Sequence, residues 1–505
     1  MNKRTFLKSG LMLAGGGLLA RGARNPSTTA IEAPDPPYTN YPVFNDLNRH
    51  AFSASGSRLN LKYADAKNRR GLRIKTLRYR AVTNKWDKEW AGDYYDVELL
   101  VSGRSVDFSL EQSPWHLKLI GKTGGTAEIV FAEEDSLLFS TEGAGLRLRP
   151  LQSYRWLDPR DAKQTVLLTS GARTFHYFLS ERDNFLAFRT ELDTDVEEAV
   201  KQAKITAIES PEGAHHFLFR ETPFEERTTL RIPNPAQAQK TARQRVEHWM
   251  ELMPAVPEAY APVLRTAWFY LHNYQVSPSE YITRPTLLCS KNSWLTKVWA
   301  WDHCFHGLAL ALGDYERGWD QIKLFFDNQL PNGGLPEPLS DLMRQTGFVK
   351  PPVHGWAIGE LMRQGGKVAA LPHVWELYRP LEEFTEFWFA YYGGNQHGLC
   401  YYRHGNDSGW DNATAFDQGL PTHGADLAAY LILQMEVLAE MANWIGRPVE
   451  ARNWQRRAQE HLELLLRRCV ANNRFVSPLV ATGKAAPCQS LLNYMPVLLG
   501  ERLPG

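Results

Sequence analysis

The chain has 505 residues, of which 43% are hydrophobic and 12% aromatic, and its formal net charge is +1. At roughly 100–200 residues per domain, this length predicts two or three domains with hydrophobic cores of their own. The near-neutral charge argues against a nucleic acid or an anionic membrane surface as partner, and the composition gives no indication of oligomeric state.

Residues 1–30 are typical of an export signal rather than of a folded segment. Lys3 and Arg4 give a basic start, and a Gly-rich apolar run follows at 10–20, which is the order found in signal peptides. The run is shorter than the about 20 apolar residues that span a bilayer. Residues 3–8 (KRTFLK) resemble the twin-arginine signal, with Lys3 replacing the first arginine. We expect a periplasmic or secreted protein, exported by this route or by ordinary secretion, with no other membrane contact.

From about 35 to 235 the chain alternates apolar and polar residues, as half-buried strands do. Many short strands at this spacing predict a β-sandwich over 31–235. Trp86, Trp115 and Trp156 could stack on flat ligands such as sugars, but core or interdomain packing is the more common use of such side chains. No catalytic group is evident here. Strands are expected at 72–75, 95–99, 106–110, 116–120, 128–131, 137–140, 164–168, 174–179, 185–192 and 215–219.

A charged, glycine-free segment at 236–253 predicts a linker helix, closed by prolines at 254 and 257. From 258 the apolar period changes to about 3.6 residues, and Leu427, Leu431, Met435, Leu438, Ala442 and Ile445 fall on one stripe. Long helices joined by irregular polar loops predict an α-solenoid or an α/α toroid, without a fixed-period repeat. Helices are expected near 258–275, 302–313, 315–329, 354–363, 373–391, 424–445, 448–468 and 487–500.

The cysteines are too scattered to predict a disulfide framework, although one bridge could form in an oxidising compartment. His303, Cys304 and His306 match no standard zinc spacing, so helix packing is the expected role of these side chains. We expect neither a metal nor another cofactor. The five cysteines are Cys289, Cys304, Cys400, Cys469 and Cys488.

Four connections in the helical half combine aromatic residues or Pro/Gly turns with Asp, Asn or His. Taken singly, each is explained as a turn or a helix entry. Taken together, they offer an aromatic face and hydrogen-bonding partners for the hydroxyls of one sugar ring. The connections are 297–303 (KVWAWDH), 328–337 (NQLPNGGLPE), 350–356 (KPPVHGW) and 405–412 (GNDSGWDN).

The same residues resemble the catalytic domain of glycoside hydrolase family 63, in the clan that includes the trehalases. The resemblance covers roughly 245–505. It implies a multidomain α+β protein in which an (α/α)6 barrel, here 258–505, follows the β-sandwich. It also implies an exo-acting, inverting α-glycosidase, in the first place an α-glucosidase, with a carbohydrate as substrate. The matching motifs, in the family's order, are WAWD at 299–302, FFDNQ at 325–329, NGGLP at 332–336, KPPVHGW at 350–356 and NDSGWDN at 406–412.

By this resemblance Asp411 is similar to the family's general acid, which protonates the glycosidic oxygen. That role calls for a pKa raised by burial and by the neighbouring Asp407. Asp407 stands where the family usually has Glu, so its carboxylate is withdrawn by about one methylene. Asp302 is the best candidate to hold sugar hydroxyls through charge-assisted hydrogen bonds. The residues expected to line the sugar pocket are Trp299, Trp301, Asp302, His354, Trp356, Asp407 and Trp410.

The resemblance also implies a second carboxylate, a late glutamate that activates water about 6.5–9.5 Å from the acid. No matching motif is found, and about eight helices are predicted, fewer than an (α/α)6 barrel contains. We therefore expect the last third of the catalytic domain to be missing, as in a truncated product, an incomplete gene model or a fragment. The glutamates available in helices but outside any such motif are Glu360, Glu376, Glu382, Glu383 and Glu386.

Two hypotheses follow. The first is an active α-glycosidase acting on an oligosaccharide or small glycoside, with trehalose or a glycosylglycerate as alternative substrates. The second is a catalytically inactive sugar-binding relative that keeps the outer pocket and lacks the base. Neither the sugar nor its linkage is specified by the sequence.

Overall fold

The computed structural model describes residues 47, 50–65, 67–78, 93–151, 154–161, 164–169, 174–180, 187–190, 205–223, 231–291, 295–341, 343–347 and 349–504. The predicted export signal, Trp86 and the Trp156 side chain lie outside this description. Residues 43–505 form one compact unit, to which everything described below belongs.

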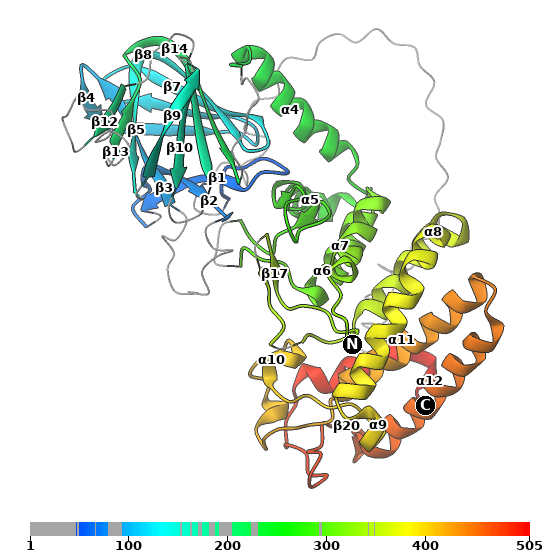
Figure 1. Ribbon diagram of the computed structural model, residues 1–505. Helices are drawn as coiled ribbons and strands as arrows, with labels where there is room; N and C mark the ends of the chain where they lie inside the picture. Colours follow the sequence, from blue (N-terminus) through cyan, green and yellow to red (C-terminus); the bar gives the residue numbers. More distant parts are fainter. Residues whose placement is uncertain are drawn as a thin grey trace. The chain divides into compact units, whose positions relative to one another are not determined.

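An antiparallel sheet of 14 described strands occupies the first part of this unit (Figure 1). Its central strand is β8 (Ser136–Pro150), whose first half pairs with β7 and β14 and whose second half pairs with β3 and β13. The partners change near Gly143, which has a φ of +62°, a conformation that glycine adopts without strain. The other strands are β1 (Leu59–Asp65), β2 (Arg70–Thr76), β3 (Asp93–Val101), β4 (Arg104–Val106), β5 (Phe108–Gln112), β6 (Leu117–Gly121), β7 (Thr126–Glu133), β9 (Tyr154–Asp161), β10 (Gln164–Thr169), β11 (Phe175–Ser180), β12 (Ala187–Thr190), β13 (Ile205–Glu209) and β14 (Gly213–Thr222).

The inner face of the sheet is apolar. In β6, for example, Leu117 and Leu119 are buried while Lys118 and Ile120 are partly exposed, which is the alternation of a half-buried strand. These inward side chains form one core with those of the neighbouring strands. The predicted series of short strands is therefore confirmed. Where a β-sandwich was predicted, the structure has a single curled antiparallel sheet, whose two halves β8 joins.

Helix α4 (Pro235–Glu251) follows the sheet. Asn234 caps its first turn by accepting a hydrogen bond from the N–H of Gln237 (3.0 Å), and Pro235 fits the first helical position. The Arg243 guanidinium of α4 lies 5.5 Å from the ring centroid of Trp115, so Trp115 packs against this helix.

The end of α4 is held to α5 (Ala261–Asn273) by two tryptophans. The Trp249 and Trp268 rings stack with centroids 5.0 Å apart. Each indole N–H donates to the other residue's carbonyl oxygen at 2.8 Å. This reciprocal pair fixes the passage from the sheet to the helices that follow.

Helix α11 (Ala425–Trp444) is buried on nearly all sides and packs against α8 and α12, whereas α6 and α7 pack against each other and against α8. The residues of the predicted stripe are all buried, yet the helix is apolar all round, as expected of a central helix. Gly355 lies against Gln434, where a Cβ would come within 2.3 Å of the backbone. The helices are α6 (Ala300–Ala311), α7 (Tyr315–Asp327), α8 (His354–Tyr391), α9 (Gly394–His397), α10 (Gly405–Ser408), α11 (Ala425–Trp444) and α12 (Pro448–Arg468).

Three of the predicted helices differ from the structure. The segments predicted at 354–363 and 373–391 form one long helix, α8, interrupted only at Gly366 (φ 68°, ψ 174°). The segment predicted at 487–500 is a 3₁₀ helix, η5 (Leu491–Arg502), in which Pro496 cannot donate a backbone hydrogen bond. Shorter elements are η3 (Glu258–Tyr260), η4 (Thr414–Phe416), β15 (Gln275–Val276), β16 (Thr286–Leu287), β17 (Leu339–Ser340), β18 (Met343–Arg344), β19 (Val470–Ala471) and β20 (Arg474–Phe475).

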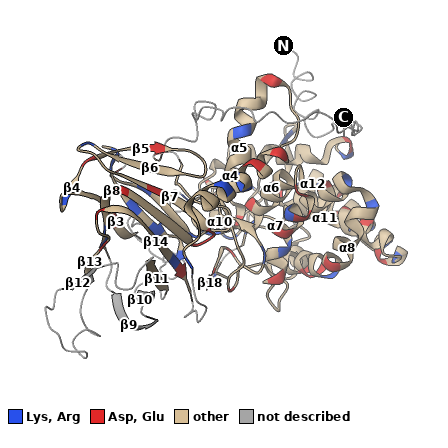
Figure 2. Ribbon diagram, turned by 90° about the horizontal axis from the view of Figure 1, so that it is seen from above, with Lys and Arg blue, Asp and Glu red and all other residues tan. Residues whose placement is uncertain are grey.

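Charged residues of both signs are interspersed along α8 and α12 (Figure 2). Within the described ranges, no helix combines the length and apolar character needed to cross a membrane.

Candidate active site

The loop at 405–412 is built tightly around backbone contacts. A Cβ on Gly405 would lie 1.9 Å from the Asp411 carbonyl oxygen, so only glycine allows this approach. Asp407 is 3% exposed, and its Oδ2 accepts hydrogen bonds from the N–H groups of Arg403 (3.2 Å) and His404 (3.1 Å). Its Oδ1 is 3.5 Å from the Val349 nitrogen. Asp407 was predicted to contact the sugar. In the structure its carboxylate instead accepts backbone hydrogen bonds and stabilises the loop.

This loop meets the start of α6 through two tryptophans. Gly409 has a φ of +72°, and a Cβ there would lie 2.5 Å from Cζ2 of Trp301. The Trp301 and Trp410 rings pack edge to face, with centroids 6.3 Å apart, a favoured aromatic geometry. Both rings are partly exposed. Two of the predicted motifs therefore form one aromatic surface.

A buried carboxylate, Glu337, holds the first turn of α6. The N-cap residue Trp299, itself partly exposed, gives no side-chain hydrogen bond to this turn. Instead, the Ala300 N–H donates to Glu337 Oε1 at 2.8 Å, which satisfies one of the free donors of a helix start. Burial raises the pKa of Glu337 well above its usual range, while the charge of Lys350 opposes this shift.

Asp302 lies in the same first turn. Burial raises the pKa of its carboxyl to about 6, and the positive charge of Lys350 acts in the opposite direction. Asp302 therefore changes its charge within the range in which many enzymes work. In its ionised form it can accept hydrogen bonds from sugar hydroxyls, as predicted.

Lys350 connects these groups with the 405–412 loop. Its Nζ lies 2.5 Å from the Asn406 carbonyl oxygen and 3.7 Å from Asp411 Oδ1. The same charge opposes the rise that burial causes in the pKa of both Asp302 and Glu337. One lysine thus interacts with three carboxylates from three of the predicted loops.

Sequence reasoning gave no role to Lys350 or Glu337, although both lie in the quoted segments. Glu337 ends the Pro/Gly turn at 328–337, and Lys350 opens the segment at 350–356. The signal in the sequence that could have indicated a role for each is a charged residue directly beside a rigid Pro-containing turn.

The predicted burial of Asp411 is wrong. Its side chain is 64% exposed, and its charged partner is the Lys350 cation rather than Asp407. The reason is local, because the inward-facing group of Asp411 is its carbonyl, which packs on Gly405, and the carboxylate points outward.

His354 and Trp356 differ in their surroundings. His354 is fully buried beside Phe326 and Phe384, with ring centroids 5.7 and 5.2 Å away. Neither ring nitrogen has a hydrogen-bond partner among the described residues, and burial lowers the pKa of this imidazole to about 3. His354 is therefore a neutral core residue. Trp356 is partly exposed, 5.7 Å from the Phe305 ring.

The glutamates of α8 are engaged elsewhere. Four of them form ion pairs with arginine or lysine, and Glu383 is exposed. None carries a geometry that marks it as the water-activating base. The pairs are Glu360–Arg363, Glu376–Lys323, Glu382–Arg379 and Glu386–Arg457.

The histidine and cysteine cluster of α6 contributes to packing. His303 makes hydrogen bonds of 2.9 Å with the Trp299 carbonyl and the Thr286 hydroxyl. All five cysteines are unpaired. Across the ranges that the structure describes, no group of three or more His, Cys, Asp or Glu side chains is arranged to hold a metal ion.

Comparison with known families identifies the helical half. Residues 296–504 match the mannosylglycerate hydrolase MGH1-like glycoside hydrolase domain. These residues belong to that family. The resemblance to family 63 that the five motifs predict is confirmed, and the MGH1-like domain contains all four loops described above. The domain is a glycoside hydrolase domain.

Several solved structures with similarity to the chain are named as glycosidases. A family 63 mannosylglycerate hydrolase from Thermus thermophilus in complex with glucose is 19% identical, with 40% of this chain and 64% of that chain covered and a TM-score of 0.36. A bacterial glucoamylase complexed with acarbose is 11% identical, covering 83% and 67%, with a TM-score of 0.47. A family GH92 α-mannosidase from Bacteroides thetaiotaomicron is 10% identical, covering 88% and 65%, with a TM-score of 0.49. The chain thus spans less than two thirds of the Thermus hydrolase. The search of curated protein sequences found no match to this chain.

Proposed function

We propose that the MGH1-like domain is an exo-acting, inverting α-glycosidase, with an α-glucoside as the first candidate substrate. Trp299, Trp301 and Trp410 offer partly exposed aromatic surface for the outer sugar ring. Asp302 would accept hydrogen bonds from its hydroxyls. We propose an (α/α)6 toroid as the complete architecture of this domain type.

Asp411 would act as the general acid. It would donate a proton to the glycosidic oxygen as the bond to the anomeric carbon breaks, so that the leaving group departs as a neutral alcohol. A base would remove a proton from the water that attacks the opposite face of the ring. This base is not assigned to any carboxylate of the chain.

The exposure of Asp411 is compatible with this role. A bound sugar would cover the carboxylate and exclude bulk water from it. Lys350, whose Nζ lies 3.7 Å from Asp411 Oδ1, would remain its charged neighbour in that complex.

One observation supports the proposal most strongly, namely the meeting of the four motifs. Trp301 packs on Trp410, Lys350 lies beside Asp411, and Glu337 caps the helix that carries Asp302. Residues from 300 to 411 are brought together in this way around one group of carboxylates and indoles.

A sugar-binding relative without turnover is the alternative function. It is favoured by the ion-paired state of the α8 glutamates, which leaves the base unassigned. Trehalose and glycosylglycerates are the alternative substrates for an active enzyme. Binding without turnover would distinguish this alternative from the first proposal.

The experiment is a screen of α-glucosides, trehalose, mannosylglycerate and glucosylglycerate, with proton NMR of the first product. An inverting α-glycosidase releases the β-anomer before mutarotation. Initial release of the α-anomer would contradict the inverting mechanism. Calorimetric binding of D-glucose without hydrolysis of any of these compounds would favour the sugar-binding relative.

A further inference from the structure

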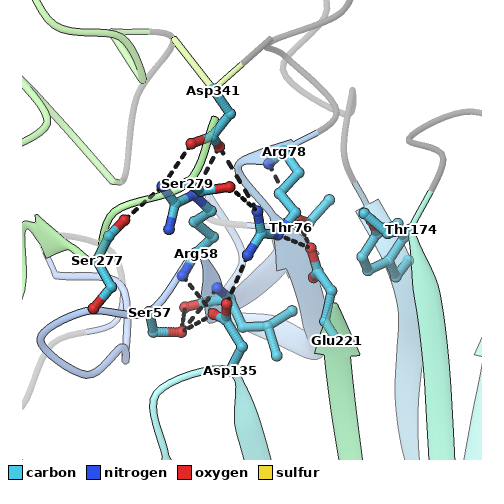
Figure 3. Close-up of polar contacts among 12 residues, drawn as sticks. Ser57, Arg58, Thr76, Arg78, Asp135, Thr174, Glu221, Ser277, Ser279 and Asp341 are labelled. Carbon is cyan, nitrogen blue, oxygen red and sulfur yellow. Dashed lines mark hydrogen bonds and ion pairs between the residues drawn. The ribbon is translucent and has the colours of Figure 1, made fainter. Parts of the chain in front are cut away.

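Five buried charged side chains connect the sheet with the β17–β18 hairpin (Figure 3). Their side chains are between 0% and 15% exposed. Burying several charges is costly unless they are paired with good geometry. The residues are Arg58, Arg78, Asp135, Glu221 and Asp341.

Arg58 makes the direct link. Its Nε and Nη2 donate to Asp341 Oδ2 at 2.7 Å and Oδ1 at 2.5 Å, a two-pronged pairing that suits the planar guanidinium. Nη2 also donates to the Ser277 carbonyl at 2.8 Å. The backbone N–H of Arg58 donates to Asp135 Oδ1 at 2.7 Å. Both ends of Arg58 are therefore fixed.

Arg78 supports this link from the sheet. Its Nη2 lies 2.9 Å from Asp135 Oδ2, and its Nε lies 3.1 Å from Glu221 Oε1. Nη1 donates to the Ser279 hydroxyl at 3.3 Å and lies 3.9 Å from Asp341 Oδ2. The Asp341 carboxylate of the hairpin thus faces two arginines at the ends of sheet strands, Arg58 directly before β1 and Arg78 two residues after β2.

From Asp341 the hairpin leads directly to the candidate site. Leu339 and Val298 exchange two backbone hydrogen bonds of 3.0 Å, and Val298 immediately precedes Trp299. Glu337, four residues before Asp341, caps α6 through the Ala300 N–H. The position of the hairpin therefore determines where the first turn of α6 is held.

We propose that Arg58 and Asp341 are positioning residues, through which the sheet holds the 337–345 hairpin so that Glu337 fixes the first turn of α6 and, with it, Trp301 and Asp302. The proposal rests on the proposed function. Two buried charges are rarely the most stabilising choice, since apolar side chains of similar size can replace such pairs with little loss of stability. Their geometric precision is the property that apolar contacts would not supply.

The test compares two variants. R58M/D341N removes both charges of the pair, so that neither partner is left buried alone. R58K keeps the positive charge but cannot donate to both Asp341 oxygens from a planar guanidinium. The matched control is R73M/D96N. Arg73 and Asp96 form a 2.7 Å ion pair between β2 and β3, within the sheet. Circular dichroism melting of the full-length chains verifies that each variant is folded at the temperature of the assays.

The first measurement is hydrogen–deuterium exchange of peptides covering 296–304 and 335–345. We expect R58M/D341N to exchange about tenfold faster in both segments, as local opening becomes easier, with R73M/D96N unchanged. Exchange in R58M/D341N that equals the control would overturn the proposal. The exchange measurement does not depend on turnover. The positioning role can therefore fail while the proposed glycosidase function stands, and the glycosidase function can fail while the positioning role stands.

The second measurement uses the best substrate from the glycoside screen. We expect KM to rise about tenfold in R58M/D341N while kcat changes less than threefold, because the displaced residues bind the outer sugar. R58K should recover part of the loss. A KM within twofold of the wild-type value would reduce the pair to a structural role. If no glycoside is turned over, calorimetric affinity for D-glucose replaces KM.

Discussion

Lys350 is the residue on which the charge of the candidate site depends most. It is nearly buried, lies 3.7 Å from Asp411 and opposes the burial-driven rise in the pKa of Asp302 and Glu337. Without it, Asp302 and Glu337 would lose this compensation, and their protonated forms would be favoured.

A pH profile of K350M tests this role. Asp302 has a pKa of about 6 and binds hydroxyls best when ionised, so kcat/KM of the wild type should fall below about pH 6. Removing the lysine charge should move this acidic limb to higher pH, by roughly half a unit or more. K350R, which keeps the charge, should leave the limb in place. An unchanged limb in K350M would contradict the assignment.

Asp426 is a second buried acid, at the start of α11. Its Oδ2 accepts a hydrogen bond of 2.9 Å from the Tyr402 hydroxyl, while Oδ1 has no partner among the described residues. Burial raises its pKa to about 7. The folded protein therefore keeps this carboxyl protonated at pH values where the unfolded chain, with a pKa of about 3.9, releases the proton.

This shift predicts a loss of stability with rising pH. The contribution of Asp426 is fully present below about pH 4 and is lost as the pH rises through about 7, by an amount on the order of a few kcal/mol. D426N cannot ionise, so its unfolding free energy should fall less between pH 5 and pH 8 than that of the wild type. Denaturant titrations at both pH values measure this. Parallel pH dependences would rule the effect out.

At the scale of the elements, two glycines let the 405–412 loop close onto α6. Gly405 admits the Asp411 carbonyl, whereas Gly409 needs its positive φ, and a Cβ there would also meet the Trp301 ring at 2.5 Å. Gly446, outside the loop, has a similar φ of +77° with no atom within 4 Å of such a Cβ. Gly409 and Gly446 therefore separate backbone strain from steric contact.

G409A and G446A should therefore differ in activity more than in stability. Each carries the strain of a left-handed alanine, about 1–2 kcal/mol. Only G409A should also displace Trp301 and lower kcat/KM, by about tenfold or more, since small misplacements in a site are costly. Melting temperatures and steady-state kinetics of the two variants provide the comparison. Equal kinetics would show that the Trp301 contact is unimportant for turnover.

Helix and strand positions followed well from periodicity, since burial of one face is a local property of the sequence. Prediction and structure differ where the backbone conformation of a single glycine determines whether an element ends or continues. Gly366 interrupts α8 without ending it, and Gly143 lets β8 serve both halves of the sheet. Neither outcome is encoded in the apolar pattern, because each depends on which partners lie on either side.

At the scale of the whole molecule, the motifs predicted which loops would meet but not what each side chain would do there. Asp407 was expected at the sugar and instead caps a turn, and His354 was expected at the pocket and lies in the core. The roles of Glu337 and Lys350 could be recognised only from the structure, because each acts on residues that are distant in the sequence. Arg58 and Asp341, 283 residues apart, extend this dependence to the sheet.

The central claim is that Asp411 protonates the leaving group, and a comparison of two substrates tests it most directly. With a glucose disaccharide, D411N should lose about 10³-fold in kcat/KM, within the usual range for a general acid. With α-glucosyl fluoride, whose leaving group requires no proton, the loss should be less than about tenfold. D417N, an exposed aspartate six positions further on, serves as the control and should match the wild type. Equal losses of D411N on both substrates, or full activity on the disaccharide, would contradict the assignment.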